Sequence, residues 1–162
     1  MSSANESSKY THFSNIEVGT ASGGGGVKIK GVQMNLDESE VIAEATTLTS
    51  ADNGKVLFLD AAAGATITLP AVADDLHFKF IVTSAFATTN WVVDSAEGDN
   101  ITGNLIVNGA AVPAAAEDQI NFVASAETVG DFIELFGDGT NSQWIVWGIG
   151  NGAGSITATD PA

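Results

Sequence analysis

Short apolar runs separated by turn-forming residues follow one another along most of this chain. In Leu76–Val82 every second side chain is apolar, which indicates a strand with one buried face. Asn53-Gly54 and Asn108-Gly109 are strong tight-turn signals. Turn signals roughly every 8–12 residues are typical of an all-β sandwich or barrel. The expected strands are Lys55–Asp60, Ala65–Leu69, Leu76–Val82, Asn90–Asp94, Asn104–Val107, Gln119–Val123, Asp131–Phe136 and Gln143–Ile149.

The ends of the chain differ from this strand-rich centre. The first part is polar, contains the glycine run 23–26, and offers only Asp37–Ala45 as a helix candidate, which is too short to be stable alone. The last residues are small and polar. We therefore expect an extended N-terminal arm over 1–45, a β-sandwich domain over 46–150 and a C-terminal tail over 151–162. The arm's apolar residues are its expected contact points with a neighbouring subunit: Tyr10, Phe13, Ile16 and Val18.

The charge of the chain restricts its partners. The 162 residues carry a formal net charge of −15, with five lysines and no arginine. Nucleic-acid binding requires Lys or Arg to replace phosphate counterions, and anionic membranes attract basic segments. We expect neither partner. The chain has no cysteine, the N-terminus lacks the apolar stretch of a secretory signal, and no apolar run approaches the roughly 18 residues of a membrane helix.

Histidines and carboxylates supply no convincing catalytic or metal site. His77 alternates with Lys79 on a polar strand face, which favours a solvated or edge histidine, and the other histidine is His12. Paired carboxylates are what glycosidases use, but turn chemistry explains most of the acids here. No catalytic, cofactor-binding or metal-ligating residue is predicted, and the chain is not expected to be an enzyme. The turn acids are Asp74-Asp75, Glu97-Gly98-Asp99 and Asp138-Gly139.

Two loops have compositions that suggest specific roles. Asp94, Glu97, Asp99 and Asn100 gather oxygen ligands in one loop, so a loosely bound surface cation stays an alternative, although the spacing does not fit an EF-hand. The loop 137–141 reads as a hairpin loop whose glycines require positive φ.

Three tryptophans could pack in the core, form an interface or stack on a sugar. Trp144 and Trp147 are three residues apart in one expected strand, so they point to opposite faces. One of them can enter the core while the other, for which we choose Trp147, faces outward as an interface aromatic. Core or interface packing is favoured over ligand stacking, with Trp91 in the same class.

Two groups of segments resemble a module found in tailed-phage virion proteins. The first is Leu48–Lys55 followed by Ala63–Pro70, where a polar turn leads to short strands ending in Leu-Pro. The second is Phe78–Val82, then Asn100–Gly103, then Gly137–Val146, where a Gly-Asp-Gly turn leads to a closing tryptophan strand. The resemblance spans residues 46–150. It implies a virion structural role, as in capsid decoration proteins and in tail fibre segments.

The short chain with a single module resembles a capsid decoration (cement) protein more than a long fibre. The resemblance implies a single antiparallel β-sandwich of jelly-roll type, assembled as a homotrimer, with the major capsid protein as partner and no cofactor. It implies a location on the outer capsid surface of the virion, after synthesis in the bacterial host cytoplasm. There, Tyr10, Phe13, Ile16 and Val18 would contact the capsid. The alternative is a short tail fibre or tail-tip protein that binds a host glycan or receptor.

Overall fold

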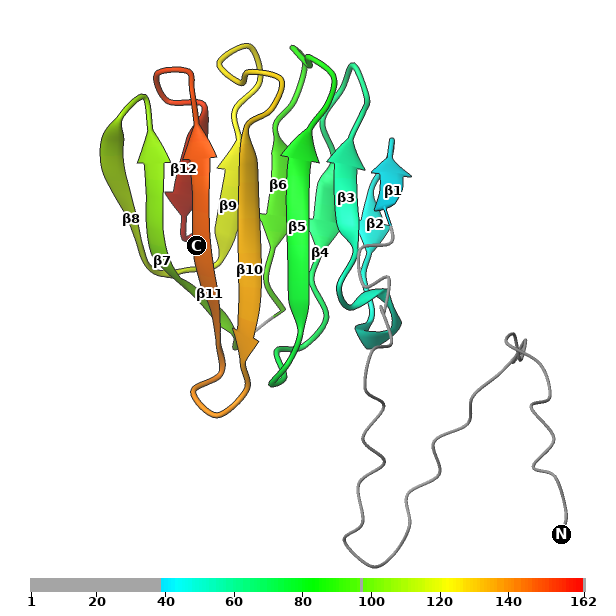
Figure 1. The fold of residues 1–162 in the computed structure, drawn as a ribbon, viewed down its shortest axis with the longest axis vertical. Helices are drawn as coiled ribbons and strands as arrows, with labels where there is room; N and C mark the ends of the chain where they lie inside the picture. The colour runs from blue at the N-terminus through cyan, green and yellow to red at the C-terminus, as the bar shows by residue number, and fades with distance from the viewer. Residues whose placement is uncertain (1–38, 97, 162) are drawn as a thin grey trace, which may run out of the picture. The chain divides into compact units, whose positions relative to one another are not determined.

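Strands form two sheets in the computed structural model, which describes residues 39–96 and 98–161 (Figure 1). The part of the chain that is described contains one 3₁₀ turn, η1 (Ser50–Asp52), and no α-helix. The seven-stranded sheet has the order β1 (Ser39–Ile42), β3 (Val56–Leu59), β5 (His77–Val82), β10 (Phe132–Asp138), β11 (Gln143–Gly150), β7 (Asn100–Val107), β8 (Ala110–Glu117). The five-stranded sheet has the order β12 (Ile156–Thr159), β9 (Gln119–Phe122), β6 (Trp91–Asp94), β4 (Thr66–Thr68), β2 (Thr46–Thr47).

The first six strands alternate between the two sheets. Strands β1, β3 and β5 run parallel in the seven-stranded sheet, and β2, β4 and β6 run parallel in the other. The chain therefore winds around the core, two strands to a turn. With β7 beside β11, five of the ten described strand pairings are parallel.

The expected purely antiparallel sandwich is thus wrong, although the all-β, sandwich-like architecture is confirmed. Polarity patterns show which face of a strand is buried, but they do not encode the direction of its neighbour. The jelly-roll topology is not confirmed, because its Greek keys are antiparallel and half of the described pairings are parallel.

Antiparallel pairs and a tight hairpin characterise the second half of the chain. Asn108 and Gly109 connect β7 to β8 with φ of 50° and 77°, as the predicted tight turn requires. In the β10–β11 loop the expectation was wrong, because neither Gly137 nor Gly139 has a positive φ. Gly137 is needed for another reason: a Cβ there would collide with the backbone oxygen of Ala73.

The core lies between the sheets and is filled by the inward-pointing side chain of every second strand residue. All eight expected strands overlap observed ones, and their alternating residues are the buried ones. The core's largest fully buried side chains are aromatic rings. They are Phe78, Phe80 and Trp144 from the seven-stranded sheet, Trp91 and Phe122 from the five-stranded sheet, and Phe86 from a loop.

Strands also occur in ranges where none was expected. Strand β1 lies within the expected arm, over residues proposed as a helix, because it pairs with β3 and buries Ile42. Strand β12 lies within the expected tail, where it pairs with β9 and buries Ile156. Strand β8 is rich in alanine, which has little intrinsic strand preference, and forms because it pairs with β7. Tertiary pairing thus overrides weak local signals.

No helix among the described residues has the length and apolar character needed to cross a membrane.

Candidate docking surface

The strand register lines up an unbroken apolar row across the outward face of the seven-stranded sheet. Each pairing places one apolar side chain opposite the next, from the first edge strand to the last. We call this set the apolar row. Its members, from β1 to β8, are Val41, Phe58, Ile81, Phe132, Ile149, Ile106 and Ala111.

A second row, two residues along each strand, contains a compact polar group. Lys79 Nζ lies 2.7 Å from Glu134 Oε1, and Trp147 Nε1 donates to Glu134 Oε2 at 2.9 Å. Lys79 Nζ also lies 4.9 Å from the ring centroid of Phe132, which meets Trp147 edge-on at 5.3 Å. Each of these groups therefore has a partner within the face itself.

This arrangement explains the ionisation of Glu134. Partial burial, the largest single influence, would raise the pKa of its carboxyl, and the hydrogen bond and charge of Lys79 oppose it. The Trp147 hydrogen bond and the nearby His77 act in the same direction, so the pKa of Glu134 lies below its ordinary value. The face thus carries one neutralised ion pair at its centre.

A third row combines aromatic and apolar groups. The rings of His77 and Phe136 stack with centroids 4.5 Å apart and planes within 5°. Ile145 lies beside Phe136 in register. The His77 Nε2 atom is buried without a hydrogen-bond partner. His77 is therefore half-buried against a neighbouring strand rather than a freely solvated side chain, and its ring adds to the nonpolar area of the face.

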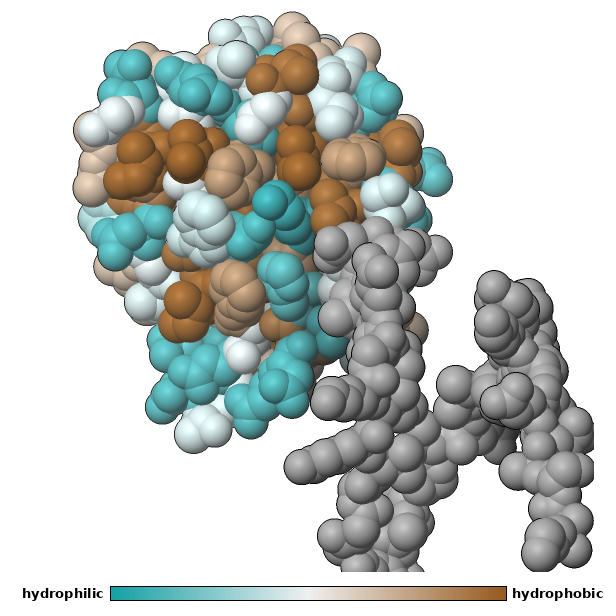
Figure 2. All heavy atoms as spheres, viewed as in Figure 1, coloured by the Kyte–Doolittle hydropathy of each residue, from teal (hydrophilic) through white to brown (hydrophobic). Residues whose placement is uncertain are grey.

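Most of the large exposed apolar side chains of the described residues belong to this one face. Seven such side chains are exposed, and six of them lie on the face: Val41, Ile106, Phe136, Ile145, Trp147 and Ile149. The seventh, Val129, lies in the loop between β9 and β10. Figure 2 shows the hydrophobic side chains gathered across this face, with hydrophilic ones between and beyond them. Contiguous apolar surface of this kind marks interaction sites.

The face is also the neutral part of an acidic protein. Its three rows contain two charged side chains, Lys79 and Glu134, and these pair with each other. Glu40 of β1 faces the opposite way from Val41 and pairs with Lys55, and the remaining carboxylates of the described residues lie at strand ends or in loops. A surface that is apolar and electrically neutral suits a lasting contact with another neutral surface.

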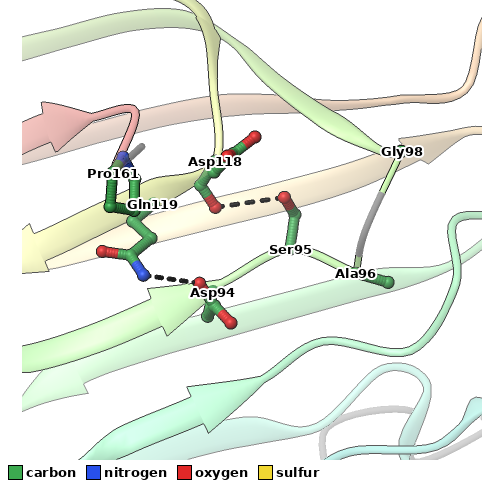
Figure 3. Close-up of a pocket in the computed structure, with 7 residues that line it drawn as sticks. All are labelled: Asp94, Ser95, Ala96, Gly98, Asp118, Gln119 and Pro161. Atoms are coloured by element: carbon green, nitrogen blue, oxygen red, sulfur yellow. Dashed lines mark hydrogen bonds between the residues drawn. The ribbon is translucent and has the colours of Figure 1, made fainter.

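The second candidate is a shallow polar depression of about 230 Å³ at the end of the five-stranded sheet (Figure 3). Gln119 Nε2 donates to Asp94 Oδ1 at 2.7 Å, and Ser95 Oγ donates to the backbone oxygen of Asp118 at 3.0 Å. Asp99, one of the four residues of the alternative cation site, accepts a hydrogen bond from the Val72 amide at 2.7 Å. No cluster of three or more metal-ligating side chains exists among the residues that the structure describes.

Two of the turn acids, Asp74 and Asp138, have structural partners. Asp74 Oδ1 accepts from the Gly139 amide at 2.9 Å and so ties two loops together. Asp138 accepts from the side chains of Asn141 and Gln143, at 2.8 Å and 3.0 Å. These two hydrogen bonds, the Asn141 one foremost, lower the pKa of Asp138. Both carboxylates thus stabilise loops.

The predicted contact residues fall into two groups. Tyr10, Phe13, Ile16 and Val18 lie outside the described residues. Trp147 is 45% exposed and Trp144 is fully buried, as their spacing in one strand predicts. The interface role of Trp147 stays a prediction.

Sequence reasoning missed the rest of the face, including Phe132, Phe136 and Ile149. The signal was present, because β10 and β11 carry large apolar residues at outward positions, such as Phe132, Phe136 and Ile149, as well as at inward ones. A strand with that pattern has two faces that need to be covered. The core covers one of them, and the other is the face described above.

Comparison of the chain with protein families, curated proteins and solved structures finds no match.

Proposed function

We propose that this chain is a non-enzymatic structural protein of a phage virion, which decorates the outer capsid surface and cements capsid subunits at their junctions. The observation that carries the proposal is the neutral, apolar face of the seven-stranded sheet on an otherwise acidic body. Such a surface provides adhesion through buried area. The resemblance of residues 46–150 to a phage virion module supplies the virion setting.

The mechanism is stabilisation by contact. Each Å² of apolar surface removed from water contributes about 25 cal/mol. Because many copies would bind across the junctions, their summed contact energy would stabilise the shell against internal pressure. The acidic remainder of the surface keeps particles apart in solution. In this proposal the arm contacts the major capsid protein through Tyr10, Phe13, Ile16 and Val18. The folded domain contacts other copies of this chain.

The position of the protein on the particle tests the proposal. Cryo-electron microscopy of purified virions, with quantitative mass spectrometry, would give the location and copy number. Decoration predicts density at capsid junctions and a copy number that grows with the number of those junctions. Density confined to the tail, with a few copies per particle, would contradict it.

The arm contacts can be tested separately in the full-length chain. Replacing Tyr10, Phe13, Ile16 and Val18 by serine removes apolar area without adding charge. We expect weaker binding to capsids that lack the protein, measured by co-sedimentation, with unchanged circular dichroism of the β-domain. Unchanged capsid affinity would disprove the arm's role but leave decoration through another surface open.

A second function, glycan recognition by a short tail fibre or tail-tip protein, is favoured by one observation. The Trp147 N–H donates to Glu134, which orients the indole ring, and 45% of the residue's surface is exposed to solvent. An oriented, exposed aromatic ring can stack on a sugar. A glycan array would detect specific binding that Trp147→Ala abolishes and that Val129→Ala, an exposed loop control, retains. Binding that both variants retain would exclude this role of Trp147.

A further inference from the structure

We infer that the outward face of the seven-stranded sheet is a self-association surface, on which a second copy of this chain docks about a twofold axis. The inference deepens the proposed function, on whose assembly role it rests, by naming the partner of this face. It starts from the strand register, which continues the apolar row through all seven strands without a polar member.

The size of the face suits a stable dimer. Two of the rows cross seven strands spaced about 4.8 Å apart and span about 29 Å, whereas the third crosses only the five strands from β5 to β8; the three rows together span about 13 Å along the strands. With the width of the side chains added, the footprint is roughly 600 Å², at the lower end of the ~600–1,000 Å² per partner of a standard interface. Two sheets can pack face to face in this way with their side chains interdigitated.

The charge distribution identifies the occupant. Residues 35–162 contain 18 carboxylates and two lysines, so a second copy is repelled by most of the surface of the first. The three rows of the face are the exception, because Lys79 and Glu134 neutralise each other there. A basic partner would gain more from the acidic surfaces elsewhere. A second copy can approach closely through a face such as this one, because no unpaired charge of the three rows opposes it.

The β8 edge of the same sheet is poorly suited to docking. The edge strand β8 includes Pro113, which has no N–H to donate, and Ala116, whose φ of 65° accompanies a register shift against β7. Both features interrupt the hydrogen-bonding pattern that an added strand would need. The β8 edge is therefore a poor docking site, and we assign the association to the face.

The centre of the face has the composition of an interface hot spot. Trp147 and Phe132 lie next to each other, and Trp147 is oriented by its hydrogen bond to Glu134. Tryptophan is enriched at interface centres, and an aromatic ring held in place loses little entropy on docking. Because a twofold axis brings the same patch of both copies together, each apolar row meets an apolar surface.

Sedimentation equilibrium of the purified full-length chain, without particles, tests the inference. We expect a dimer for the wild type. Ile149→Glu places a charge within the apolar row, and burying it should weaken the dimer at least about 100-fold. Val129→Glu is the matched control, since it has the same net charge and an exposed loop position, and it should dimerise like the wild type. Ile106→Glu is a second face variant if Ile149→Glu fails to fold, and near-ultraviolet circular dichroism checks both.

Acrylamide quenching gives a readout that needs no substitution. Trp91 and Trp144 are fully buried, so Trp147 supplies the accessible tryptophan fluorescence. Quenching should fall as the wild-type concentration rises through the dimer transition, and it should stay high in Ile149→Glu. A monomeric or trimeric wild type, or quenching that association leaves unchanged, would overturn the inference. The trimer is the assembly that the phage resemblance implies.

The two proposals fail in different experiments. A monomer in free solution would disprove the self-association surface but would not change the copy number expected on virions. A tail location would disprove capsid decoration but would leave the dimer standing.

Discussion

The two tryptophans of β11 show how strongly the environment of one residue depends on its position in a strand. Trp144 packs against Phe78 in the core with ring centroids 5.8 Å apart, whereas Trp147 lies on the outward face. The same residue type therefore stabilises the fold at one position and is available for contact at the other. The sequence predicted this difference, because it follows from the two-residue period of a strand.

Alanine substitution at each tryptophan should separate these roles. Trp144→Ala leaves a large cavity and should lower the free energy of unfolding by about 3–5 kcal/mol. Trp147→Ala removes one hydrogen bond and an edge-on ring contact, and should cost about 1 kcal/mol. Urea denaturation at a fixed low protein concentration measures both. A larger loss for Trp147→Ala would contradict the burial of the two rings.

Glu134 should make stability depend on pH in the acidic range. The pKa of Glu134 lies below its ordinary value of 4.5, so the ionised carboxylate favours the folded state. Its contribution is complete above pH 4.5 and is lost as the pH falls through the lowered pKa. Since both partners are partly exposed, the contribution should be about 1 kcal/mol or less.

Glu134→Gln isolates this effect from that of other acids. The stability difference between wild type and variant should be largest near pH 7 and should vanish at strongly acidic pH. Urea titrations of both proteins at several pH values measure it. A difference that persists at acidic pH would show that Glu134 acts through packing instead.

At the scale of elements, the sequence predicted strands better than it predicted their partners. Apolar alternation and turn dipeptides are local signals, and they located eight strands. The winding of β1 to β6 from sheet to sheet, and the parallel pairs that result, depend on contacts between distant residues. The strands β8 and β12 were missed for the same reason, since pairing and not propensity forms them.

Two glycines at hairpins should respond differently to substitution. Gly109 has a φ of 77° and open space where a Cβ would lie, so only backbone conformation restricts it. Gly109→Ala should cost about 1 kcal/mol, and Gly109→Asn less, because asparagine tolerates this conformation. Gly137→Ala should cost about 1–3 kcal/mol through its collision with the Ala73 oxygen.

Asparagine at Gly137 provides the control that distinguishes the two causes. If the restriction at Gly137 is steric, Gly137→Asn should be at least as destabilising as Gly137→Ala. Thermal unfolding of the four variants compares them directly. Recovery of stability in Gly137→Asn would show that its backbone conformation, and not the contact with Ala73, requires glycine.

At the scale of the whole molecule, the chain is strongly acidic, and in its described part the outward face of the seven-stranded sheet is neutral and apolar. Mutual repulsion between acidic copies opposes association at neutral pH, and this repulsion disappears as the carboxylates are protonated. The sequence has a pI of about 4.1. We therefore expect a solubility minimum close to that pH, measured by turbidity at low salt.

The apolar face should decide how much protein associates at that minimum. Ile149→Glu and Val129→Glu add the same charge and have nearly the same pI. Ile149→Glu should give less turbidity near pH 4.1 than Val129→Glu, because it interrupts the apolar row. Equal turbidity for the two variants would show that charge neutralisation alone drives association.

The sequence by itself determined the β character of the chain, the places of its tight hairpin and main strands, its acidic surface and the opposite facing of Trp144 and Trp147. Each depends on composition or on neighbours a few residues apart. Only the tertiary structure decided the parallel pairings, the role of Gly137 and the alignment of Val41, Phe58, Ile81, Phe132, Ile149, Ile106 and Ala111 into one row. These depend on which distant strands become neighbours and in which register, and a one-residue shift in any pairing would break the row.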